Sequence, residues 1–92
     1  MSRGEYGKAK EYLEKALEIR IEIGDRKGEE ADYGNLGSIF LSRGEYGKAK
    51  EYYEKALEII IEIGDRQGEA VAYGNLGTVF HALGEYGIVG SR

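Results

Sequence analysis

The chain has 92 residues, which is enough for one small domain. Its 17 acidic and 13 basic residues give a net charge of −4, and the two signs are interspersed rather than gathered into the basic stripe typical of nucleic-acid binding. The absence of cysteine excludes disulfides and thiolate metal sites. No apolar run approaches the roughly 20 residues of a membrane span, and the N-terminus has no apolar stretch of signal-peptide type. We therefore expect a soluble cytoplasmic protein that binds neither nucleic acid nor membrane.

Residues 1–40 and 41–80 are two copies of one sequence that differ at only nine positions. A third copy starts with Gly84-Glu85-Tyr86-Gly87 and then stops matching. A period of this length is typical of solenoids, in which each unit buries its apolar face against the next unit. We therefore expect one helical repeat domain over residues 1–87 and a tail outside the repeat at residues 88–92.

Each copy is predicted to begin with a long helix, over residues 6–23 and again over residues 46–63. Apolar and small residues recur there every three or four positions, which places them on one helical face. In the second copy these residues are Ala49, Tyr52, Tyr53, Ala56, Leu57, Ile60 and Ile63. Gly24 and Gly64 follow, and glycine suits the left-handed conformation that often ends a helix.

Each copy is predicted to continue with another helix, over residues 27–42 and 67–83, capped at its N-terminus by Asp25 or Asp65. Each of these helices contains interior glycines, which cost about 1 kcal/mol each relative to alanine in an isolated helix. We therefore expect them to depend on packing against their neighbours, and to end at Gly44 and Gly84. Their apolar faces are Tyr33, Leu36 and Phe40, and Tyr73, Leu76 and Phe80.

The aromatic, Leu-Gly and alanine positions of this pattern resemble a tetratricopeptide repeat. The matching residues are Tyr33, Leu36-Gly37, Phe40, Gly44, Tyr46, Ala49, Tyr53 and Ala56-Leu57. The resemblance implies an all-α solenoid of antiparallel helix–turn–helix repeats that binds proteins or peptides without a cofactor. The period is 40 residues rather than the usual 34, and Ile61 replaces the usual closing proline. Long repeats of this kind resemble those of G-protein-signalling modulator scaffolds.

The first helix of such a repeat is called A and the second B, so the four predicted helices have the order B-A-B-A. Only residues 27–63 form a complete repeat, and the leading B helix and the trailing A helix each expose an apolar face. Because the two faces match, we expect a homo-oligomer formed head to tail or by domain swapping of helices. Two functions remain open: a protein-binding scaffold that also self-associates, and a purely structural unit that assembles without a foreign ligand.

The A helices line the concave surface in this family, and the resemblance places a peptide-binding groove there. The expected groove residues are Gly34, Asn35, Ser38, Leu41, Gly74, Asn75, Thr78 and His81, flanked by Ala31, Ser42, Val71 and Ala82. In relatives the two asparagine positions often hydrogen-bond a peptide backbone, because an amide both donates and accepts; the alternative is that both are ordinary surface amides. None of these positions is Lys or Arg, so we expect a small, weakly apolar, neutral groove for an apolar peptide or helix rather than a carboxylate clamp.

The residue inventory does not support catalysis or metal binding. His81 is the only histidine, and a lone histidine makes neither a metal site nor a catalytic triad. The carboxylate pairs Glu29/Glu30 and Glu58/Glu62 are expected on a solvated helix face, without the burial that tunes an acid–base catalyst. We therefore expect neither an enzyme nor a metal site.

Overall fold

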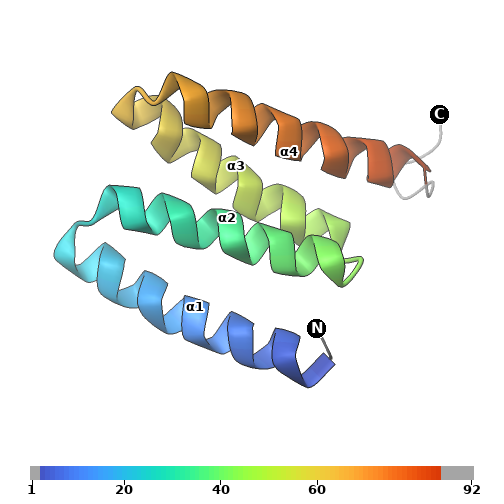
Figure 1. Cartoon of the computed structure of the whole chain (residues 1–92), viewed down its shortest axis with the longest axis horizontal. Helices are drawn as coiled ribbons and strands as arrows, with labels where there is room; N and C mark the ends of the chain where they lie inside the picture. Colours follow the sequence, from blue (N-terminus) through green and yellow to red (C-terminus); the bar gives the residue numbers. More distant parts are fainter. Residues whose placement is uncertain (1–2, 86–92) are drawn as a thin grey trace.

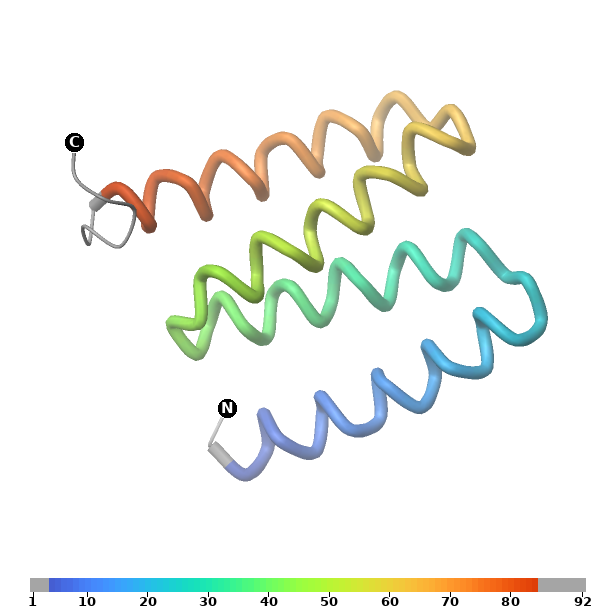
Figure 2. The backbone as a smooth tube through the Cα atoms, turned by 180° about the vertical axis from the view of Figure 1, so that it is seen from behind, coloured from blue at the N-terminus to red at the C-terminus, as the bar shows by residue number. Residues whose placement is uncertain are grey.

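The computed structural model describes residues 3–85 and is a succession of four antiparallel helices (Figure 1). They are α1 (Arg3–Ile23), α2 (Arg26–Ser42), α3 (Tyr46–Ile63) and α4 (Arg66–Glu85). Helices that are consecutive in the chain pack against each other: α1 against α2, α2 against α3 and α3 against α4. The view from behind shows the same order, with α1 and α4 at opposite ends (Figure 2). The expected all-α repeat architecture is confirmed, and the described residues contain no strand.

The α1–α2 and α3–α4 turns follow from their glycine and aspartate residues. Gly24 and Gly64 adopt the left-handed conformation, with φ of 76° and 75°. The carboxylates of Asp25 and Asp65 then accept hydrogen bonds of 2.9 Å from the backbone amides of residues 28 and 68, which lie in the first turn of α2 and α4. Both caps are as predicted, and each turns the chain back in two residues.

The predicted end of the last helix at Gly84 is wrong, because α4 continues to Glu85. Gly44, the equivalent glycine, takes φ of 77° and leads into α3, which folds back on α2. Gly84 is not among the glycines with positive φ and lies within the last turn of α4. The expected boundary at residue 87 and the tail at 88–92 lie outside the described part of the chain.

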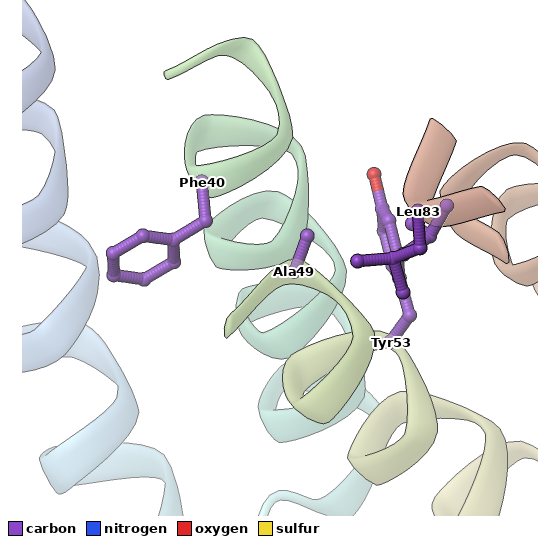
Figure 3. Packing of buried hydrophobic residues seen from close by; sticks show 5 residues of the cluster. Phe40, Ala49, Tyr53 and Leu83 are labelled. Atoms are coloured by element: carbon purple, nitrogen blue, oxygen red, sulfur yellow. The ribbon is translucent and has the colours of Figure 1, made fainter. Parts of the chain in front are cut away.

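The core lies among α2, α3 and α4. Its central cluster consists of Phe40, Ala49, Tyr53, Val79 and Leu83. Figure 3 shows Tyr53 beside Leu83 between α3 and α4. Phe40 projects from the side of α2 that faces away from these two residues. In contrast, none of the residues described in α1 is fully buried. The helix at the start of the chain is therefore the least integrated part of the fold.

Candidate functional site: a groove between two A helices

A groove of about 180 Å³ lies between α2 and α4, with α3 as its floor. The floor consists of Tyr53, Ala56 and Ile60, all of which are buried. The complete lining is Lys27, Glu30 and Gly34 from α2, the three floor residues from α3, and Asp65, Gly68, Val71, Ala72 and Asn75 from the start and body of α4. The groove therefore has the size of a few side chains and a mainly apolar floor.

The groove is open at Gly34 because that residue has no side chain. A Cβ atom placed there would meet no atom within 4 Å. On the facing wall, Val71 is exposed and Asn75 is half-buried. A ligand in the groove would therefore contact an apolar floor, one exposed valine and one amide that can donate and accept a hydrogen bond.

One end of the groove is charged. Lys27 Nζ lies 3.1 Å from the Asp65 carboxylate and 3.5 Å from the Glu30 carboxylate. The hydrogen bond to Asp65 and the charge of Glu30 raise the pKa of Lys27. The Gly68 amide, followed by Lys27, lowers the pKa of Asp65. The expectation of a neutral groove is therefore wrong, and this end holds two carboxylates against one ammonium group.

The structure brings together only part of the predicted groove set. Gly34 and Asn75 line one groove, while Asn35 and Gly74 do not. The reason is that the groove takes its first wall from one A helix and its second wall from the next. Gly34 lies in the first wall and Asn75 in the second, whereas their copies Gly74 and Asn35 do not line this groove.

The remaining predicted residues have other contacts. Ser38 Oγ lies 3.0 Å from the Tyr53 hydroxyl, a hydrogen bond that fixes the floor tyrosine. Leu41 packs against the core cluster. The Thr78 hydroxyl donates to the Gly74 carbonyl of its own helix at 3.1 Å, and His81 is exposed. None of these four residues lines the groove.

The charged end and the floor were not among the predicted site residues, although the sequence contains a signal for both. The 11 lining residues occupy 11 different positions of the 40-residue repeat, and six of these positions differ between the two copies. Only three of the other 29 positions differ. The six lining residues that differ from their copies are Lys27, Glu30, Tyr53, Ile60, Val71 and Ala72.

A second expectation, that Glu29 is solvated, is also wrong. Glu29 is buried in the first turn of α2, where Arg26 donates to its carboxylate at 2.9 Å. Arg26 also donates to Glu62 of α3 at 2.6 Å, which lowers the pKa of Glu62. The two carboxylates thus hold one guanidinium between α2 and α3, an arrangement that joins the two helices.

The described residues contain no cluster of acidic or histidine side chains able to hold a metal ion. Within the same residues, no helix is long and apolar enough to cross a bilayer.

The stacked antiparallel helices and the groove between alternate helices define a helical-repeat protein of the solenoid class. A tetratricopeptide-repeat family model matches residues 1–62 and, in a second overlapping match, residues 29–87. The chain therefore belongs to the tetratricopeptide-repeat family, whose members generally mediate protein–protein interactions and are typically not enzymes. Comparison with curated proteins gives no match. The finer resemblance to G-protein-signalling modulator scaffolds stays a prediction.

Proposed function

We propose that this chain is a protein-interaction module that binds a peptide or a helix in the groove between α2 and α4. The observation that carries the proposal is the distribution of differences between the two copies. Only three of the other 29 repeat positions differ between the copies, while six of the 11 groove positions have changed. Such a pattern is expected where the repeats share a fold and the groove is adapted to a particular ligand.

The chemistry of the lining favours a ligand with apolar side chains and no excess of carboxylates. Tyr53, Ala56 and Ile60 offer an apolar floor. At the charged end Lys27 is already engaged by Glu30 and Asp65, so a ligand carboxylate there would meet two negative charges. This arrangement supports an apolar or basic peptide and disfavours the clamping of a C-terminal carboxylate.

The test uses a displayed library of random 12-residue peptides, selected on the chain and then measured as synthetic peptides by fluorescence anisotropy. The informative variant is Gly34→Leu, because the new side chain would fill the open side of the groove without a clash at its Cβ position. We expect this substitution to weaken binding of the selected peptides at least tenfold.

The chain offers a matched control in Gly74→Leu. Gly74 is the equivalent glycine of α4, also has open space at its Cβ position, and does not line the groove. At a concentration that keeps the chain monomeric, peptides selected on the parent chain should bind this variant with unchanged affinity. Peptides that bind the parent and the Gly34→Leu variant equally well would contradict the groove as the binding site.

The structure also supports the second candidate function, self-association. Phe40 of α2 is 2% exposed, whereas Phe80, its copy in α4, is 50% exposed because no helix follows α4 among the described residues. We define the trailing face as Arg66, Tyr73, Gly77 and Phe80 of α4, and the leading face as Tyr12, Ile19 and Glu22 of α1. Sedimentation velocity over a range of concentrations tests this function, and a monomer at millimolar concentration would contradict it.

A further inference from the structure

The contact between α2 and α3 shows how an A helix in this chain receives the B helix that follows it. Tyr52 of α3 lies in a slot formed by two rings of α2. Its ring stacks on Phe40, with centroids 5.5 Å apart and planes 2° apart, and lies 6.1 Å from the ring of Tyr33. Lys55 Nζ is 5.6 Å from the Tyr52 ring and 5.7 Å from the Tyr33 ring, which adds a cation–π contact.

The two ends of the molecule expose the halves of this same contact. The slot on α4 is formed by Tyr73 and Phe80, and Tyr12 of α1 is the copy of Tyr52. Tyr12, Tyr73 and Phe80 are 72%, 52% and 50% exposed. Aromatic side chains are the residues most often responsible for affinity when they enter a complementary pocket. The trailing face therefore offers an aromatic slot, where Lys50 Nζ of the same chain lies 5.7 Å from the Phe80 ring centroid. The leading face offers the ring that corresponds to Tyr52.

The exposed fractions of equivalent isoleucines in α1 and α3 distinguish residues of the leading face from residues that are exposed in both helices. Ile19 is 54% exposed, whereas its copy Ile59 is 2% exposed. Ile21 and its copy Ile61 are 53% and 52% exposed, so their exposure does not depend on the position of the helix in the stack. Among the described residues, α1 has a neighbouring helix on one side only, and the exposure of Ile19 follows from this.

Gly77 is the copy of Gly37, a glycine that the close approach of the next helix requires. At Gly37, the equivalent position of α2, a Cβ atom would lie 2.8 Å from the ring of Tyr53, so the approach of α3 requires glycine. At Gly77 a Cβ atom would meet nothing within 4 Å. Glycine weakens a helix relative to alanine, and no described residue of the single chain occupies the space beside Gly77.

The charged residues of the α2–α3 contact also have copies at the two ends. Arg26 and Glu62 pair across that contact at 2.6 Å, and their copies are Arg66 on the trailing face and Glu22 on the leading face. The side chain of Arg66 is 87% exposed, against 41% for Arg26. Opposite charges therefore stand at corresponding positions of the two exposed faces.

Other features of the contact are kept with one exception. Lys15, the copy of Lys55, is present in α1 to complete the cation–π contact. Leu13 replaces Tyr53, so the hydrogen bond between the tyrosine and Ser38 has no equivalent. The helix directions are also suitable, because the start of α1 and the end of α4 lie at the same edge of the molecule (Figure 1).

We infer that the trailing face of one chain receives the leading face of a second copy in the register of the α2–α3 contact. Tyr12 of the second copy enters between Tyr73 and Phe80, and Glu22 pairs with Arg66. This inference rests on the proposed self-association and gives it a geometry. The contact joins two different faces, so it continues from chain to chain unless it closes into a ring.

The same register creates a second groove at each junction. Gly74 of one chain and Asn35 of the next occupy the positions that Gly34 and Asn75 occupy within a single chain. Assembly would therefore bring into one groove the two predicted binding residues that a single chain leaves apart.

Two complementary variants test the contact. A leading-blocked chain carries Tyr12→Gln and Ile19→Gln, and a trailing-blocked chain carries Tyr73→Gln and Phe80→Gln. All four side chains are exposed, so both variants should fold, as circular dichroism would verify. We expect each variant alone to be monomeric by sedimentation velocity, and a 1:1 mixture to form a heterodimer that does not grow further. The control Ile21→Gln/Ile61→Gln removes two equally exposed apolar residues and should assemble like the parent.

The outcomes distinguish the register from self-association in general. Self-association of either blocked variant alone would indicate a symmetric contact or helix exchange, and would overturn the head-to-tail contact while leaving self-association intact. Two blocked variants that stay monomeric when mixed would also overturn it. A parent chain that remains monomeric would overturn both, and peptide binding to the groove would be unaffected by any of these results.

A charge reversal tests the register itself. Arg66→Glu in the leading-blocked chain should weaken the heterodimer roughly fivefold, since an exposed ion pair contributes little and its reversal adds repulsion. Glu22→Arg in the trailing-blocked chain should restore the affinity by re-forming the pair in the opposite sense. If each substitution weakens the heterodimer and the two together do not restore its affinity, Arg66 and Glu22 do not meet in the contact.

Discussion

Arg20 and Asp32 form the main ionic contact between α1 and α2. Arg20 Nε donates to the Asp32 carboxylate at 2.9 Å, and the Asp32 side chain is only 6% exposed. In the other copy the same two positions are Ile60 and Ala72, and both are buried. The same two repeat positions therefore hold an ion pair between α1 and α2 and two apolar residues between α3 and α4.

This duplication predicts the effect of breaking the ion pair. Arg20→Met leaves a buried carboxylate without its partner, and we expect the midpoint of thermal unfolding to fall by about 10 °C. The double variant Arg20→Ile/Asp32→Ala introduces the apolar pair of the other copy and should unfold within a few degrees of the parent. A single variant as stable as the parent, measured by circular dichroism, would show that the buried carboxylate does not need Arg20.

The capping aspartates make stability depend on pH. The Gly28 amide and then Arg20 lower the pKa of Asp25, and the Gly68 amide and then Lys27 lower the pKa of Asp65. Because each pKa is below its ordinary value of 3.8 in the folded chain, both aspartates stabilise the fold above that pH, and the stabilisation is lost as pH falls through the folded value.

We therefore expect the unfolding midpoint to be nearly constant between about pH 5 and 7 and to fall steeply below about pH 4. Asp25→Asn/Asp65→Asn keeps a side-chain oxygen for each cap but removes both titrating groups. Its midpoint should be lower at pH 7 and should depend less on pH in the acid range. An acid transition as steep as that of the parent would assign the pH dependence to other carboxylates.

At the scale of the helix, two equivalent glycines have opposite structural roles. A Cβ atom at Gly37 would press on the ring of Tyr53, and two atoms of that ring lie 2.8 Å away. We expect Gly37→Ala to destabilise the chain by about 1–3 kcal/mol, because the ring or the helix must move. Gly77 has open space, so Gly77→Ala should stabilise the single chain by up to about 1 kcal/mol. Urea unfolding at a concentration that keeps the chain monomeric measures both effects, and equal effects would contradict the difference in packing.

The four helices and their turns could be predicted from the sequence because local chemistry determines them. The apolar period, the Gly-Asp turns and the aspartate caps all act within a few residues of each other. The charged end of the groove could not be found in this way, because Lys27 and Asp65 are 38 residues apart and meet only when α2 and α4 stack around α3. Asn35 and Asn75 look equivalent in the sequence, and only the stack shows that one of them lines a complete groove.

At the scale of the whole molecule, stability is expected to decrease from the middle of the stack toward its ends. Each unit of a solenoid is stabilised by its immediate neighbours. Residues 6–23 of α1 and 46–63 of α3 differ at only two positions, yet α3 has five fully buried residues and α1 has none among those described. A difference in stability between these two helices must therefore come mainly from their positions and only slightly from their composition.

Native-state hydrogen exchange measures this difference directly. At a concentration that keeps the chain monomeric, we expect the amides of α1 to exchange at least tenfold faster than the equivalent amides of α3, because α1 opens without disrupting the core. At concentrations that favour assembly, α1 and α4 should both become more protected as each gains a neighbour. The leading-blocked variant should show no such gain in α1. Equal protection of α1 and α3 in the monomer would mean that one neighbouring helix stabilises a B helix as strongly as two neighbouring helices do.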